Sequence, residues 1–548
     1  MKLNYKRVIL VGFAFFLISA FWQAYDSLVP MMLVNKFGLN QTWSGFIMTL
    51  DNILALFMLP LFGSLSDKTK TKYGKRTPYI VLGTIVAVCA FIGLSFADNA
   101  QLNKVYANSA DNKAFIEVLW EENAQVTNLE EGGKINVQDY MSRIYKNKDF
   151  SDLSDTEKVE IKDTFVNLID HSKLTYTYDN GVYGNINEDG SNNIYTNVVV
   201  PARSVHCWSQ TVANPTTLVI FFLLLLLTLC AMATFRSPAV ALMPDVTIKP
   251  LRSKGNAVIN LMGAAGGIIV LLLGMLLKTG SVYNQMMSYT AMILCVCAVM
   301  VIALAIFIWK VKEVKWVKEM EEESVRLGIE EKVEETDDNQ EKRKLSKSEF
   351  TSLILILASV ALWYMGYNAV TSKYSLYAST VLQQDYNSTL IIAQAAAIIS
   401  YIPVGIIASK LGRKKTILAG VIMLATAFIS ANFIVPNSPS ILMYIIFALA
   451  GMGWATINVN SFPMVVELTK GGDVGKYTGF YYTASMAAQS ITPTLSGIFM
   501  DLTGTMKVLF PYASIFVALA FVTMLFVKHG DSIPTNVKKG LEALDVDD

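Results

Sequence analysis

A short pattern of aromatic and polar residues occurs twice in the chain. The first copy is the heptapeptide 21–27, and the second is the heptapeptide 363–369. The same offset relates a glycine and lysine-rich loop that begins at Gly63 to another that begins at Gly405. Repetition on this scale predicts a chain built from two similar halves. The copies differ at one ionisable position, where Asp26 in the first corresponds to Asn368 in the second.

The composition excludes an ordinary soluble protein of this length. The chain has 548 residues, of which 53% are hydrophobic and 16% charged, and its mean hydropathy is +0.42. Apolar stretches of about 20 residues, the length that crosses a bilayer as a helix, recur along it. We expect an all-α membrane protein with twelve spans in two six-helix parallel-repeat halves. The spans are 8–33, 44–65, 78–97, 216–243, 255–277, 287–309, 350–372, 388–409, 415–434, 440–464, 477–499 and 509–528.

Basic residues predict the orientation. Lysines and arginines gather in the loops after spans 2, 4, 8 and 10, and such loops stay in the cytoplasm. Both termini are therefore expected in the cytoplasm of a multi-pass cell-membrane protein. The apolar run after Lys6 and Arg7 is too long for a signal peptide and is expected to remain.

The polar segments divide the chain further. We expect spans 1–3 in 1–97, a small extracytoplasmic insertion in 98–215, spans 4–6 in 216–309, a charged cytoplasmic linker in 310–349, spans 7–12 in 350–528 and a cytoplasmic tail in 529–548. Within the insertion, 113–169 has helical spacing and 174–200 has the pattern of turns and strands. The segment 185–190 resembles the front of a calcium loop, but Thr196 stands where the bidentate glutamate belongs, so a polar turn is the better interpretation.

These features together resemble the major facilitator superfamily. The loop from Ser66 to Ile80, which contains Asp67 and Gly74-Lys75-Arg76, is similar to that of sucrose/proton symporters and glycoside-pentoside-hexuronide:cation symporters. The resemblance implies a transporter that moves a sugar with a cation. This chain differs in having Val240 where the sucrose carriers have a sugar-binding arginine, with Arg236 one turn deeper.

Two acids lie inside predicted spans. An aspartate there costs about 2.5 to 3.5 kcal/mol, so it needs water, a partner or a proton. We expect Asp26 to be the main cation-coupling residue and Asp51 the second. The alternative is that both lie near the outer water interface and only hydrogen-bond their neighbours.

A sugar-binding site in this fold lies between the halves near the membrane midplane and offers aromatic faces, amides and charged groups. A buried amide often serves only to hydrogen-bond neighbouring helices. The prediction therefore depends on the clustering of the candidate residues and not on any one of them. The candidate substrate-binding residues are Trp22, Gln23, Tyr25, Asn52, Arg236, Tyr364, Tyr367, Asn368, Gln394, Asn458 and Asn460.

The cytoplasmic loops are expected to form a gate. The family resemblance implies that Asp67 and Arg76 help to hold the halves closed on that side, and Asp245 or Glu467 is expected to pair with basic loop residues. Ordinary interfacial charge is the alternative. The candidate gating residues are Gly63, Asp67, Gly74, Lys75, Arg76, Asp245, Arg413, Lys414 and Glu467.

The sequence therefore favours a secondary active transporter that imports a sugar or glycoside with a proton or sodium ion by alternating access. An efflux antiporter of small hydrophobic compounds and a membrane sensor with a ligand-binding external domain remain as alternatives. We expect no enzyme activity, no metal site, no cofactor beyond the coupling ion and no nucleic-acid partner. The expected partners are a small-molecule substrate and the lipid bilayer, and the expected oligomeric state is a monomer.

Overall fold

The computed structural model describes residues 3–106, 112–127, 134–167, 199–248, 251–281, 284–326, 346–435, 438–466 and 474–530. Within them, twelve long helices follow the order of the predicted spans. They are α1 (Tyr5–Asn35), α2 (Gln41–Lys68), α3 (Thr77–Tyr106), α8 (Thr216–Asp245), α9 (Arg252–Leu276), α10 (Thr290–Lys310), α12 (Lys347–Tyr377), α13 (Tyr386–Leu411), α14 (Arg413–Ala431), α15 (Ser440–Val466), α16 (Val474–Thr503) and α17 (Leu509–Leu525).

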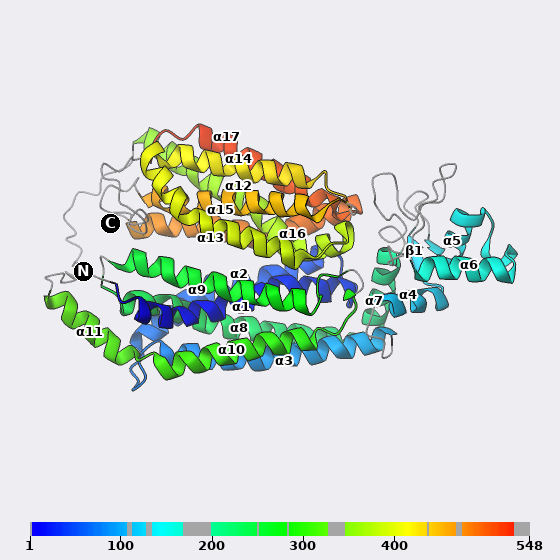
Figure 1. Ribbon diagram of the computed structural model, residues 1–548, viewed down its shortest axis with the longest axis horizontal. Coiled ribbons are helices and arrows are strands. Elements are labelled where there is room, and N and C mark those ends of the chain that lie inside the picture. Colours follow the sequence, from blue (N-terminus) through cyan, green and yellow to red (C-terminus); the bar gives the residue numbers. More distant parts are fainter. Residues whose placement is uncertain are drawn as a thin grey trace.

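The helices form two groups that lie against each other (Figure 1). In the first half, α1 packs against α9 and α3 packs against α8. In the second half, α15 packs against α13 and α14, and α12 packs against α16 and α17. The repeated heptapeptides lie in α1 and α12, the first helix of each half. The halves meet chiefly where α2 packs on α16, α9 on α13 and α1 on α12.

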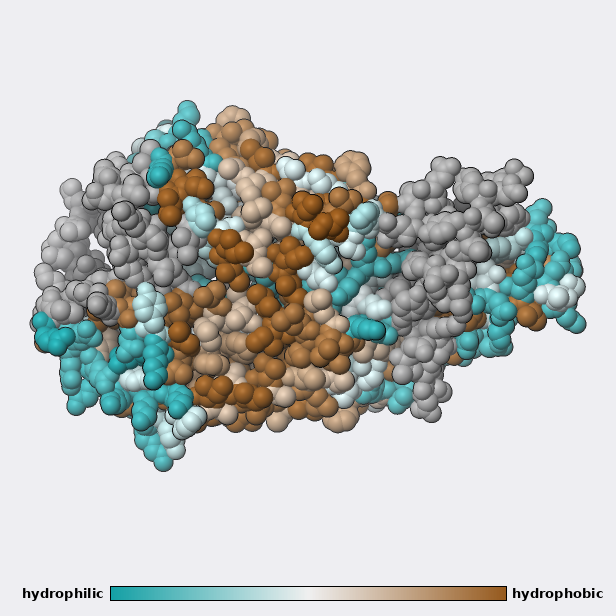
Figure 2. Space-filling view, viewed as in Figure 1, coloured by the Kyte–Doolittle hydropathy of each residue, from teal (hydrophilic) through white to brown (hydrophobic). Residues whose placement is uncertain are grey.

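An apolar belt surrounds the helices. Figure 2 shows hydrophobic residues across the middle of the bundle and hydrophilic residues toward both ends. In the part of the chain that the structure describes, ten of the helices are long and apolar enough to cross a membrane by length and composition. A helix satisfies its own backbone groups, which is why it can stand in such a belt. Gln394 on α13 hydrogen-bonds Gln23 of the other half, and Ser485 on α16 is buried, so these polar side chains do not face lipid.

The helices extend beyond several predicted boundaries. α3 continues to Tyr106, past the expected end of span 3 at 97, and α12 starts at Lys347 and passes into a π-helical turn (η5), Ala378–Leu382. The charged linker contains α11 (Glu313–Arg326), and its remainder, 327–345, lies outside the described residues. α11 lies at the end of the bundle opposite the insertion (Figure 1).

The insertion projects from one end of the bundle, called here the insertion end (Figure 1). It contains α4 (Asn112–Glu121), β1 (Gln125–Thr127), β2 (Lys134–Asn136), α5 (Val137–Lys146), the 3₁₀ turn η1 (Phe150–Asp152), α6 (Asp155–Val166) and α7 (Val200–Ala213). β1 and β2 pair antiparallel within 113–169, where only helical spacing was predicted. The strands predicted in 174–200 and the polar turn at 185–190 lie outside the described residues except for the start of α7.

The halves make their tightest contact at the insertion end. Gly45 of α2 faces the carbonyl of Pro493 on α16, and Gly497 of α16 faces the carbonyl of Gln41 on α2. A Cβ atom at either glycine would collide with backbone, so only glycine permits this approach. The Asp501 carboxylate accepts hydrogen bonds from the Gln41 amide at 3.0 Å and the Thr42 amide at 2.8 Å. Asp501 therefore caps α2 from the other half, where the helix dipole favours a negative charge.

We predict that Gly45→Ala destabilises the contact between the halves. Overpacking of this kind costs about 1–3 kcal/mol, so the apparent melting temperature of the purified protein in detergent should fall by a few degrees. The matched control is Gly479→Ala, also on α16, because no atom lies within 4 Å of a Cβ built there. Equal melting temperatures for the two variants would show that the α2–α16 contact is looser than described.

Candidate functional site

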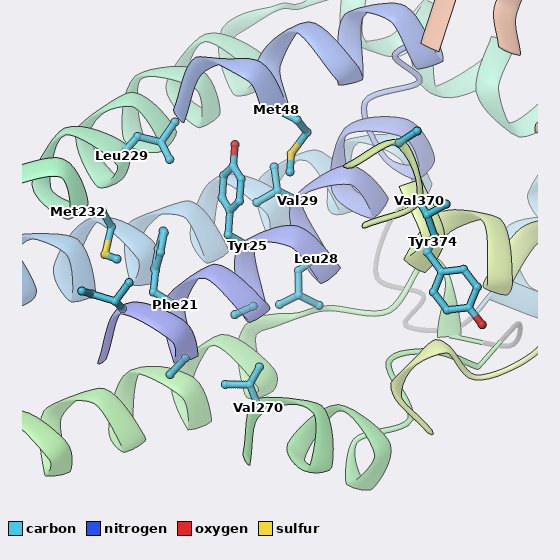
Figure 3. Close-up of a cluster of buried hydrophobic side chains, with 14 of the residues drawn as sticks. Phe21, Tyr25, Leu28, Val29, Met48, Leu229, Met232, Val270, Val370 and Tyr374 are labelled. Atoms are coloured by element: carbon cyan, nitrogen blue, oxygen red, sulfur yellow. The ribbon is translucent and has the colours of Figure 1, made fainter. Parts of the chain in front are cut away.

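Three side chains of α1 lie near the middle of the bundle. Trp22, Gln23 and Asp26 are half-buried, whereas Tyr25 is 1% exposed. Figure 3 shows Tyr25 within a cluster of buried side chains that includes Phe21 of the same helix and Leu229 of α8. Tyr25 is therefore packed into the first half, where it lies close enough to Asp26 and Asp51 for an electrostatic interaction, and its role in substrate contact stays a prediction.

The two predicted coupling acids lie in one electrostatic cluster. Asp26 and Asp51 are close enough to repel each other, and Arg236 of α8 attracts Asp51. Asn52 donates a hydrogen bond from Nδ2 to Asp51 Oδ1 at 2.8 Å. The Arg236 guanidinium lies over the Trp22 ring at 5.6 Å from its centroid, a cation–π geometry. Two acids and one arginine thus meet at the centre of the first half, beside an indole ring.

The second half contributes an aromatic group. Tyr367 of α12 stacks on Trp454 of α15, with ring centroids 3.7 Å apart and planes within 4° of parallel. Tyr364 meets the same indole edge-on at 5.1 Å. Asn368 is half-buried and donates from Nδ2 to the Tyr364 carbonyl at 2.8 Å, so it ties its own helix together.

Two contacts join these groups across the halves. Gln394 of α13 donates from Nε2 to Gln23 Oε1 of α1 at 2.6 Å. Tyr367 lies close enough to Asp26 for an electrostatic interaction. Asp26 therefore faces the second half and not lipid.

The remaining polar candidates differ in their surroundings. Asn458 of α15 is exposed and hydrogen-bonds Tyr401 of α13. Asn460 is buried and donates to the Thr456 carbonyl at 2.8 Å. Asn460 thus bonds a carbonyl of its own helix, and its role in substrate binding stays a prediction.

The first candidate gate forms one charged network at the end opposite the insertion. Arg76 contacts Asp67, and its Nε donates to Asp245 Oδ2 at 2.9 Å. Lys75 Nζ lies 3.2 Å from the same Asp245 oxygen. Arg76 also contacts Ser66, and Gly63 packs against Ser237 of α8. The Asp245–Arg76 pair is one of the predicted pairings, and all of these contacts lie within the first half.

Glu313, which the sequence analysis did not select, anchors this loop to α11. Its carboxylate accepts from the backbone amides of Lys75 at 2.7 Å, Arg76 at 2.9 Å and Thr77 at 2.8 Å, and from the Thr77 hydroxyl at 2.7 Å. Gly74 has φ +113°, and the Glu313 carboxylate occupies the space where a Cβ would stand. Glu313 is 2% exposed and lies at the positive end of α3, where a carboxylate is stabilised.

The second loop is arranged differently. Lys414 donates to the carbonyls of Leu525 at 2.9 Å and Val527 at 2.6 Å, so it holds the end of α17. Arg413 is 7% exposed. The predicted partner Glu467 lies outside the described residues.

A second missed residue is Lys373 of α12, at the insertion end. Its side chain is fully buried, and Nζ donates to the Gln41 carbonyl at 2.8 Å and lies 3.3 Å from Gln41 Oε1. Asp501 lies close enough to attract it. Lys373 directly follows the predicted span 350–372 but lies within α12, and a lysine inside a membrane helix rarely lies there without a partner.

We predict that Glu313→Ala releases α11 from the loop. Hydrogen bonds to charged groups contribute about 1.5–3 kcal/mol, so amide hydrogen exchange in α11 should accelerate by at least about tenfold. Glu321→Ala is the matched control, because Glu321 is an exposed residue on the same helix. Exchange that is unchanged in Glu313→Ala would contradict the anchoring role.

Comparisons with known proteins agree with this architecture. The model of the Major Facilitator Superfamily matches residues 204–400 and 384–543, and that of the MFS/sugar transport protein family matches residues 10–106. The structure is similar to the inward open conformation of the xylose transporter XylE from E. coli, with TM-score 0.55, 12% identity and 99% of each chain covered.

Two further solved structures show the same fold. A D-xylose-proton symporter has TM-score 0.53 and 11% identity, with 96% of this chain and 98% of that one covered. The nucleoside transporter NupG has TM-score 0.50 and 11% identity, with 96% and 100% covered. The family and these neighbours indicate a transporter and not an enzyme. The chain is a multi-pass membrane protein that belongs to the Major Facilitator Superfamily.

Proposed function

We propose that the protein is a proton-coupled importer of a sugar or glycoside. The observation that carries this proposal is the central cluster, in which two acids lie near one arginine and Asp26 lies near Tyr367 of the other half. With both acids ionised, the cluster of Asp26, Asp51 and Arg236 has one negative charge in excess. A single proton on Asp26 neutralises it, which favours the binding of an uncharged cargo in a poorly hydrated site.

The aromatic groups suit a sugar as the cargo. The C–H faces of a sugar ring pack on aromatic faces, and its hydroxyls require hydrogen-bonding partners. Trp22 and Trp454 supply ring systems from opposite halves, and Gln23 and Gln394 supply amides between them. These amides already hydrogen-bond each other, and they offer further donors and acceptors to sugar hydroxyls, which an apolar cargo would not use.

The contacts between the halves support alternating access. The described hydrogen bonds of Asp501, Lys373 and Gln285 join the halves at the insertion end. At the opposite end, the Arg76 network stays within the first half. We propose that this is the inward-facing state, with the insertion outside the cell and both termini in the cytoplasm. The similarity to an inward open transporter supports this assignment of state.

The coupling role of Asp26 can be tested in sealed proteoliposomes. Labelled mono- and disaccharides are screened for uptake under an imposed proton gradient and, separately, a sodium gradient. We predict that Asp26→Asn abolishes uphill accumulation driven by protons but retains exchange of internal for external cargo, because exchange needs no deprotonation. Asp163→Asn, an exposed position on α6, is the matched control.

Three outcomes would contradict this account. Accumulation by Asp26→Asn at the wild-type level would remove Asp26 from the coupling step. Accumulation that follows the sodium gradient alone would replace the proton by sodium. Uphill movement of hydrophobic compounds outward, with no sugar transported, would favour the efflux antiporter.

The cargo-stacking role of Trp454 gives a separate prediction. Aromatic contacts of this kind contribute about 0.5–1.5 kcal/mol beyond the contribution of the buried surface area. Trp454→Ala should therefore raise the KM for the transported sugar by about two- to tenfold. Trp454→Phe retains a ring against Tyr367 and should show the smaller effect. Initial uptake rates across a range of sugar concentrations measure both. Equal KM values for Trp454→Ala and wild type would place the cargo elsewhere.

A further inference from the structure

The insertion reaches into the contact between the two halves through one helix, α7. Arg203 of α7 is 1% exposed. Its Nη2 donates to Asn35 Oδ1 at 2.8 Å, at the end of α1, and its Nη1 donates to Gln285 Oε1 at 2.7 Å, in the segment between α9 and α10. Gln285 in turn donates from Nε2 to the carbonyl of Ser379 at 2.8 Å. Ser379 belongs to the π-helical turn that follows α12, in the second half.

These three contacts form a continuous chain from the insertion to both halves. Arg203 holds the acceptor end of the Gln285 amide, which directs its donor end at Ser379. An amide in a buried position that has both ends engaged is fixed in orientation, because rotation would place donor against donor. Separation of the halves at this end must break the bond from Gln285 to Ser379.

Other contacts make α7 part of the bundle and not a loose appendage. Thr211 Oγ1 donates to the Phe37 carbonyl at 3.0 Å, and the Cys207 thiol lies 3.3 Å from the Asn35 carbonyl. Gly38, with φ +69°, packs directly against the backbone of Ser204 and Trp208. α7 therefore covers the α1–α2 connection, next to the Asp501 cap at the start of α2. A shift of the insertion would be transmitted to this connection.

We propose that Arg203 is a positioning residue of the gate at the insertion end, and that the insertion thereby controls how readily this gate opens. The inference rests on the alternating-access function proposed above, but it concerns the role of the insertion and not the cargo. Through this residue, the insertion stabilises the closed gate. Any molecule or modification that moved α7 would change the rate of opening without contacting the transport site.

The test measures gate opening directly, in the full chain and without cargo. Spin labels are placed at Thr216 and Ser440, which are exposed at the start of α8 and α15, in opposite halves. Cys89, Cys230 and Cys295 are replaced by serine. Cys207 and Cys297 can stay because both are buried. Burial raises the pKa of the Cys207 thiol to about 12 and keeps it protonated. The distance distribution then reports the ratio of open to closed gates.

We expect Arg203→Met, which removes the donors but keeps an unbranched apolar stem, to raise the open-to-closed ratio by about fivefold or more. Arg143→Met is the matched control, because Arg143 is an exposed arginine of the insertion whose partner Asp149 also lies there. Gln285→Leu should give a similar rise. The double variant should open no more than the larger single variant, because both residues act through one chain of bonds.

Two results would overturn the proposal. One is an unchanged distance distribution in Arg203→Met. The other is a strictly additive double variant, which would mean that Arg203 and Gln285 act independently. If Arg203→Met does not fold, Gln285→Glu is the deciding variant, because the glutamate still accepts from Arg203 but cannot donate to the Ser379 carbonyl. An unchanged open-to-closed ratio in Gln285→Glu would then contradict the proposal. Failure of the sugar-uptake assay would leave these distances unaffected, so the two proposals fail separately.

Discussion

Charges and amides that are buried in the bundle lose their contact with water, and the structure must supply their hydrogen-bonding and charge partners. An apolar belt encloses the bundle, and each polar group inside it must find a partner within the protein. The central cluster meets this requirement only in part, because Asp51 has Arg236 and Asn52 whereas Asp26 faces a tyrosine ring of the other half. A proton on Asp26 would neutralise the one negative charge that has no cationic partner in this cluster. The proton coupling proposed here would then follow from the same desolvation that shapes the fold.

The two ends of the bundle use charge in different ways. At the insertion end, Asp501 and Lys373 join the halves by binding backbone of α2, so the contact depends on the position of a helix terminus. At the opposite end, Glu313 binds the backbone of the loop before α3, within the first half. Contacts to backbone are broken by rigid movement of a helix and not by rotation of a side chain. Such contacts suit an element that switches between two discrete positions.

Much of the fold could be predicted from the sequence, since apolar runs of span length and the repeated heptapeptides fix the number and pairing of the helices. The extension of α3 to Tyr106 could not, because residues after 97 are polar and their helix is stabilised by contacts such as that of Gln101 with Thr211. The pair β1 and β2 was also missed, since strands of three residues are too short for an alternating pattern.

The candidate site could be proposed only in outline. Repetition pointed to Asp26, Tyr364 and Tyr367, and by the same argument to Tyr25, whose side chain is buried in its own half beside Asp26 and Asp51. Trp454 was missed because its place in the candidate site comes from stacking on Tyr367, which lies far away in sequence. Glu313 was missed because it begins a charged linker, where one more glutamate gives no signal. Such roles depend on tertiary contacts that no local pattern encodes.

The most direct test of the central claim is the movement of protons that accompanies the cargo. Purified protein in lightly buffered proteoliposomes is given a transported sugar with no imposed gradient, and the external pH is recorded in sodium-free and sodium-containing media. The account predicts that the external medium becomes alkaline when sugar enters, about one proton per sugar, in both media. Sugar entry without any change in external pH would contradict it.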